Sequence, residues 1–158
     1  MDLNKKNALL FADHIFGDKD GKISYTKLCS GVLSDGKDGK KRLHCALGEA
    51  YVWFIKPEVE RDYLKKISRE RITKEEGKGG MDGDEGVSSE GTLTNTVAKL
   101  IADSAKLKSE NKYDELLRSL VDLASTNDDS EGEDAGDYFE RARSVAENWT
   151  ENVVPLLK

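Results

Sequence analysis

The stretch RLHCALGEAYVWFIK, residues 42–56, constrains the fold more than any other part of the chain. On a helical wheel its apolar side chains cover almost the whole circumference, and only a few polar residues interrupt them. A helix that is apolar nearly all round is buried in a protein core. Pro57 ends the helix or forces a corner in it, because a proline ring clashes with the preceding turn. We therefore expect a central helix over residues 42–56, with four large side chains mostly buried: Leu43, Leu47, Trp53 and Phe54.

The length of 158 residues fits one domain, residues 1–158, which buries about two-thirds of the surface of the unfolded chain. No run approaches the roughly 18 apolar residues of a membrane span, and the N-terminal residues lack the apolar core of a secretion signal. We therefore expect a cytoplasmic protein that does not enter a membrane. In that compartment Cys29 and Cys45 are expected to be reduced thiols.

Apolar spacing predicts two helices before the central one. A short helix over residues 25–33 has Ser24 as its N-cap, and the glycine-rich segments on either side of it are expected to be loops. An earlier helix runs from residue 4 to about residue 16. Its expected inward residues are Leu9, Leu10, Ile15 and Phe16.

The second half of the chain shows the same helical spacing, interrupted by two polar loops at residues 75–91 and 127–137. No segment shows the alternation of a half-buried strand. We predict an all-α fold, a compact bundle of about six or seven helices around the central one. The later helices are expected at residues 57–74, from residue 92 onward, at 113–124 and at 137–153.

Charge is divided unevenly along the chain, whose net charge is -6. Residues 37–74 carry eleven basic and six acidic side chains, whereas residues 75–158 carry nine basic and twenty acidic ones. The basic block includes one helical stripe that is able to neutralise phosphates, so a nucleic-acid partner is one alternative. The acidic tract at residues 128–137 is able to compete for the same stripe. The stripe consists of Arg61, Lys65, Lys66 and Arg69.

Residues 18–24, DKDGKIS, resemble part of an EF-hand calcium loop. The resemblance implies a calcium site, which is a second alternative. With Gly21 at the sixth position, the first position holds Phe16 and the twelfth holds Lys27, where the family has oxygen ligands. The remaining metal ligands would be Asp18, Asp20 and Ser24.

Three fragments, LGEAY, KYDEL and DYFERA, resemble parts of tetratricopeptide helix pairs. They place a small residue where two helices approach and an aromatic residue near a helix start. Their spacing does not follow the family's repeat of about 34 residues. The resemblance therefore implies packed helix pairs without a repeat array.

Catalytic patterns are scarce in this sequence. It contains only two histidines, His14 and His44. His44 and its neighbour Cys45 point about 100° apart on a helix, so they do not form a thiol–imidazole pair. His14 is able to join Asp18 and Asp20 in a weak metal site, but we expect a surface histidine. We predict a non-enzymatic binding module without a cofactor, a small subunit or adaptor that contacts a protein partner.

Overall fold

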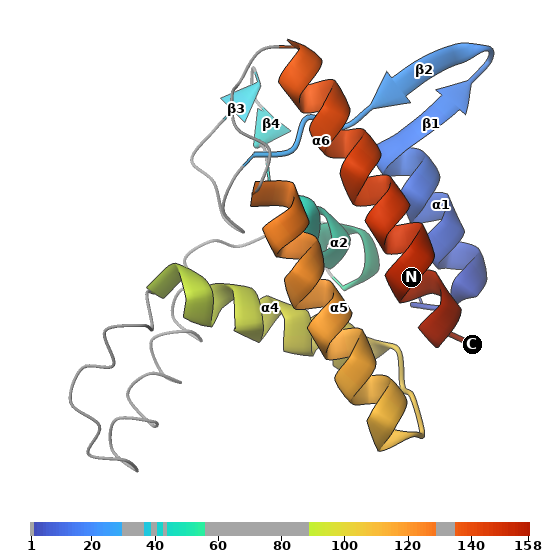
Figure 1. Cartoon of the computed structure of the whole chain (residues 1–158), viewed down its shortest axis with the longest axis vertical. Coiled ribbons are helices and arrows are strands. Elements are labelled where there is room, and N and C mark those ends of the chain that lie inside the picture. Colours follow the sequence, from blue (N-terminus) through green and yellow to red (C-terminus); the bar gives the residue numbers. More distant parts are fainter. Residues whose placement is uncertain (1, 30–36, 39–40, 43, 56–88, 129–134) are drawn as a thin grey trace.

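The computed structural model describes residues 2–29, 37–38, 41–42, 44–55, 89–128 and 135–158. This part of the chain is mostly helical, which confirms the broad prediction, and Figure 1 shows how the helices cross around α2. A π-helical turn and a 3₁₀ turn extend the last helix, at Trp149–Val153 and Val154–Leu156. The α-helices are α1 (Lys5–Ile15), α2 (Ala46–Phe54), α4 (Ser89–Ser104), α5 (Glu110–Asp128) and α6 (Ala135–Asn148).

Helix α1 begins where the sequence predicts. The side chain of Asn4 accepts a hydrogen bond from the amide of Asn7 at 2.9 Å, which satisfies one of the free donors of the first turn. The amide of Lys5 donates to the carbonyl of Lys158, also at 2.9 Å. This bond explains why the first helix lies beside the end of the last one in Figure 1.

The inward face of α1 differs from the predicted one. Leu9 and Leu10 are each 47% exposed, although the sequence analysis placed them inside. A different row of α1 residues faces the core, because that row contacts Trp149. The indole N–H of Trp149 donates to the carbonyl of Ala8 at 2.9 Å. Because Leu9 and Leu10 are adjacent and both apolar, the local sequence gave no reason to prefer one helix face over the other as the inward one. The buried residues of the helix are Ala8, Phe11, Ala12 and Ile15.

A β-hairpin follows α1, so the prediction of a fold without strands is wrong here. Strand β1 (Phe16–Lys19) pairs in antiparallel fashion with β2 (Lys22–Tyr25). Asp20 and Gly21 connect them with φ angles of 56° and 73°. Two positive φ values at an Asp-Gly pair fit the tight type I′ hairpin turn, whose twist matches that of the strands. The hairpin projects from the end of α1 in Figure 1.

The predicted helix over residues 25–33 is also wrong in its described part. Tyr25 ends β2, and residues 26–29 have no regular secondary structure. Long-range hydrogen bonds hold this segment instead: Arg141 donates to the carbonyl of Leu28, and Asn127 donates to that of Cys29. These bonds satisfy carbonyl groups that a helix would otherwise satisfy internally. Residues 30–33 lie outside the described part.

The central helix is shorter than predicted. A second small hairpin, β3 (Lys37–Asp38) with β4 (Lys41–Arg42), takes up the expected helix start, and α2 begins at Ala46. The amide of Ala46 donates to the side-chain oxygen of Asn127 at 3.1 Å, so α5 supplies the cap of α2. Leu43 lies outside the described residues.

The core surrounds α2, as predicted. Leu47 and Phe54 are buried, whereas Trp53 is only half-buried. Helices α4 and α5 pack on each other across a short connection and cross in Figure 1. The largest side chains that are fully buried are Phe11, Ile15, Leu28, Leu47, Val97, Ile101, Leu116, Leu120, Leu123 and Trp149.

At the ends that the structure describes, the two polar loops are shorter than the sequence predicted. Helix α4 already begins at Ser89, α5 continues to Asp128, and α6 starts at Ala135. Residues 75–88 and 129–134 lie outside the described part. Of the helices that the structure describes, none combines the length and the apolar character needed to cross a membrane.

Candidate functional site

An open cleft of about 460 Å³ lies where the C-terminal end of α1 meets β1 and α2. Its volume falls within the range of small-ligand sites in proteins. Trp53 is the α2 residue that lines it, while α1 and β1 supply the others. The lining residues are Leu10, Asp13, His14, Gly17, Asp18, Lys19 and Trp53.

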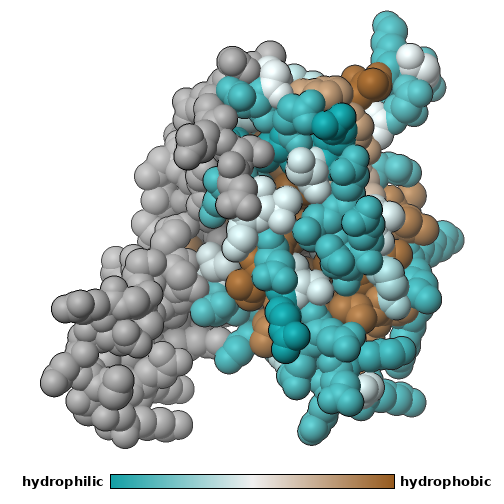
Figure 2. Space-filling model, in the orientation of Figure 1, coloured by the Kyte–Doolittle hydropathy of each residue, from teal (hydrophilic) through white to brown (hydrophobic). Residues whose placement is uncertain are grey.

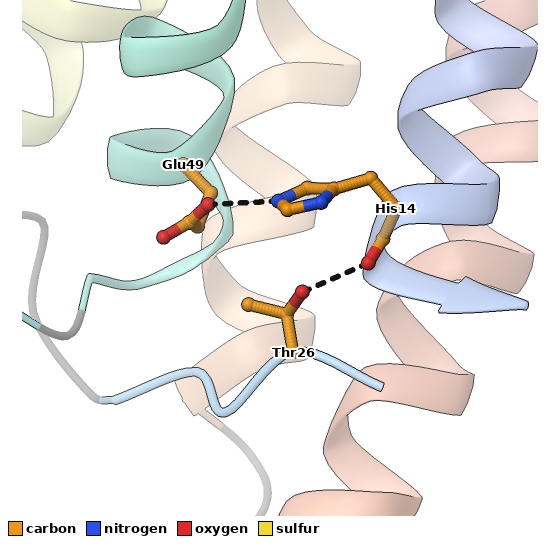
Figure 3. Close-up of polar contacts among 3 residues, drawn as sticks. All are labelled: His14, Thr26 and Glu49. Carbon is orange, nitrogen blue, oxygen red and sulfur yellow. Dashed lines mark hydrogen bonds and ion pairs between the residues drawn. The ribbon is translucent and has the colours of Figure 1, made fainter. Parts of the chain in front are cut away.

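His14, one of the residues that line this cleft, is paired with Glu49 of α2. Nε2 of His14 lies 3.1 Å from Oε2 of Glu49, and the imidazole N–H donates to the carboxylate (Figure 3). The Glu49 carboxylate is largely buried, and the His14 ring is partly exposed to the cleft. The hydroxyl of Thr26 donates to the backbone carbonyl of His14 at 2.8 Å and so fixes the end of α1. The buried Glu49 carboxylate needs the imidazole N–H of His14 as a hydrogen-bond donor, because removing a carboxylate from water without a partner is costly.

The ring of Trp53 stacks on His14. Their centroids are 4.6 Å apart and their planes differ by 24°. Phe11 lies behind Trp53, with centroids 6.0 Å apart, and it also contacts the buried Trp149. Among the described residues the indole N–H of Trp53 has no hydrogen-bond acceptor. Ring packing therefore fixes Trp53 at the cleft wall.

Two carboxylates at the rim have no bonding partner among the residues that the structure describes. Asp13 and Asp18 are exposed, and neither has an ion pair or a side-chain hydrogen bond with any residue in the described ranges. Gly17 of β1 permits the close approach of this strand to the backbone of Asp13. A Cβ atom at this position would lie only 2.6 Å from the carbonyl oxygen of Asp13.

The chemistry available in the cleft is recognition by charge and by aromatic surface. Nε2 of His14 is already engaged with Glu49. Among the described residues, no group of three or more His, Cys, Asp or Glu side chains is placed to hold a metal ion. The arrangement combines a hydrogen-bonded histidine, a partly apolar wall and a charged rim.

The calcium-loop residues occupy the β1–β2 hairpin. Asp18 belongs to β1 and Ser24 to β2, while Asp20 lies in the turn. The Ser24 hydroxyl donates to the carbonyl of Gly17 at 3.2 Å, and the ammonium group of Lys27 lies 5.7 Å from the ring centroid of Tyr138. The hairpin pairs Asp18 with Ile23 across the strands. Of the three proposed ligands, only Asp18 lines the cleft.

The residues proposed for nucleic-acid contact, Arg61, Lys65, Lys66 and Arg69, lie outside the described residues. Sequence reasoning missed Glu49 and the role of Trp53. A glutamate on a helix that is otherwise apolar was the available signal, since a buried charge requires a partner. His14 is more buried than the surface histidine that we expected.

The chain was also compared with known proteins. Neither protein-family models, nor curated proteins, nor solved structures gave a match to it.

Proposed function

We propose that this chain is a non-enzymatic helical binding module, a small subunit or adaptor that acts through protein–protein contacts. One observation carries the proposal: large apolar side chains are exposed on α1 and on the adjoining hairpin. Leu9 and Leu10 are each 47% exposed and Ile23 is 59% exposed. We call the surface made by these three residues the α1–hairpin face.

The α1–hairpin face continues into the cleft. Leu10 belongs to both, because it also lines the cleft beside Trp53. Ile23 lies opposite Asp18, another lining residue, in the hairpin. Figure 2 shows apolar atoms in groups within a largely polar surface, one of them beside the projecting hairpin. An apolar patch with a polar rim and an aromatic pocket is typical of protein interfaces.

The wider proposal includes a single domain over residues 1–158 and a bundle of about six or seven helices. A cytoplasmic location belongs to it as well and rests on the sequence alone. The nucleic-acid alternative rests on residues 61–69, and the calcium alternative rests on residues 18–27. We prefer protein binding to the nucleic-acid and calcium alternatives, because the exposed apolar residues of the α1–hairpin face support it.

Partner capture tests the proposal. The tagged chain and its Leu10→Ser/Ile23→Ser variant are purified from the organism of origin, and proteins bound in stoichiometric amount are identified. Ile55→Ser serves as the matched control, because Ile55 is also exposed and lies about 200° from Trp53 around α2. Thermal unfolding verifies that both variants remain folded.

We expect a stoichiometric partner that the double variant loses and the control keeps. Retention of the partner by the folded double variant would exclude the α1–hairpin face. Absence of any stoichiometric partner, together with turnover in a substrate screen, would overturn the proposal as a whole.

A further inference from the structure

The cleft beside α1 favours a positive charge. Two of its rim residues, Asp13 and Asp18, are carboxylates without an ion pair in the described part of the chain, and Lys19 is the single lysine that lines it. His14, which also lines the cleft, is hydrogen-bonded to the buried Glu49. The carboxylates of the rim therefore outnumber its ammonium groups.

The backbone adds to this preference. Asp13 and His14 belong to the last turn of α1, whose C-terminal end at Ile15 carries the negative end of the helix dipole. Such an end attracts cations over about one helical turn. The dipole and the two carboxylates thus act in the same direction at the same place.

The wall of the cleft suits a long side chain with an apolar stem. Trp53 is half-buried and Leu10 is 47% exposed, and both line the cleft. Long basic side chains lay their methylene groups along apolar surface and keep the charged end in a polar environment. A guanidinium group also packs favourably against an indole ring and accepts carboxylate partners in its own plane.

We propose that this cleft binds an arginine side chain presented by the protein partner. The stem lies along Leu10 and Trp53, and the guanidinium is attracted by Asp13, Asp18 and the end of α1. This inference rests on the proposed function, because it assigns the cleft as the specificity pocket of the α1–hairpin face. A glutamate or aspartate side chain would meet like charge at the rim and is rejected.

A peptide series tests the assignment. The probe is the pentapeptide amide Leu-Ala-Arg-Ala-Leu, compared with the same peptide carrying citrulline, lysine or glutamate in the central position. Citrulline is the sharpest comparison, because it keeps the shape of arginine and removes its charge. Binding is measured by calorimetry and by tryptophan emission. Of the two tryptophans, Trp149 is fully buried, so a change in emission reports on Trp53.

Two substitutions on the protein complete the design. Asp13→Asn and Asp18→Asn remove the rim charges from exposed positions without altering size. Asp122→Asn is the matched control, an exposed aspartate on α5, which does not line the cleft. Each rim substitution should weaken binding of the arginine peptide by about fivefold, the size expected for an exposed ion pair, and the control should leave it unchanged.

The proposal predicts the order arginine, lysine, citrulline, glutamate, from tightest to weakest, with binding that weakens as salt is added. Equal affinity for arginine and citrulline, undetectable binding of the arginine peptide, or Asn variants that bind like the wild type would each overturn it. Capture of the native partner distinguishes a failure of the arginine pocket from a failure of the α1–hairpin face. If the Asp13→Asn/Asp18→Asn variant keeps that partner while Leu10→Ser/Ile23→Ser loses it, the arginine pocket is wrong and the α1–hairpin face remains.

Discussion

Glu49 accepts a hydrogen bond from His14 at 3.1 Å, across 35 positions of sequence. The bond joins the buried side of α2 to the last turn of α1, and it engages His14, which lines the cleft (Figure 3). Glu49 is only 7% exposed, so its carboxylate has little access to water. A charged acceptor that loses its donor in such a place pays its desolvation without compensation.

A double-mutant cycle on this pair gives the first prediction. His14→Phe keeps a ring against Trp53 but removes the donor, and it should lower the free energy of unfolding by about 2 kcal/mol. Glu49→Leu removes the acceptor. The double variant should be more stable than the sum of the two losses implies, because no carboxylate is left without a donor. Urea unfolding measures all four proteins, and strictly additive losses would show that the bond contributes nothing.

The second prediction contrasts two leucines. Leu47 is fully buried on α2, so Leu47→Ala should lower the free energy of unfolding by roughly 2–5 kcal/mol. Leu9 is 47% exposed, and Leu9→Ala should change it by less than about 0.5 kcal/mol. Chemical denaturation of both variants checks the contrast. Similar losses at the two sites would mean that α1 does not expose Leu9 in solution.

Helical periodicity predicted those parts of the fold in which local spacing and burial agree. On α5, Leu116, Leu120 and Leu123 follow the helical repeat and are all fully buried. The repeat fails on α1, because adjacent apolar residues there offer more than one possible inward face. Trp149, far away in the sequence, decides between them through its contacts with Ala8 and Phe11. The candidate cleft escaped prediction for the same reason, since it joins residues from three elements.

The hairpin was missed although a local signal was present. Asp20-Gly21 is the dipeptide most typical of a two-residue hairpin turn, but the flanking segments FGDK and KISY lack clear alternation. Gly21 has a φ of 73° and open space around its missing Cβ. The third prediction is that Gly21→Ala destabilises the fold by about 1 kcal/mol through backbone strain, whereas Gly21→Asn costs less because asparagine tolerates this conformation. Thermal unfolding ranks the variants, and equal melting temperatures would contradict a type I′ turn.

The fourth prediction concerns nucleic acid. We expect weak binding of labelled single- and double-stranded DNA at physiological salt, because residues 75–158 carry an excess of acidic side chains that repel a polyanion. Fluorescence anisotropy over a salt series measures it, with the Arg61→Ala/Lys65→Ala variant and, as control, Lys112→Ala on α5. Submicromolar binding that the double variant weakens, with a flatter salt dependence, would make the nucleic-acid alternative the leading one.

The last prediction tests how the early segments are held to the helical core. Asn127 is fully buried on α5, and its side chain accepts from the amide of Ala46 at 3.1 Å and donates to the carbonyl of Cys29 at 2.9 Å. Asn127→Ala removes the cap of α2 and one anchor of residues 26–29, so the free energy of unfolding should fall by about 2 kcal/mol. Ser125→Ala, an exposed change on the same helix, should have little effect. Hydrogen exchange adds a local readout: the Ala46 amide should exchange faster in Asn127→Ala, and unchanged protection of that amide would rule out the cap.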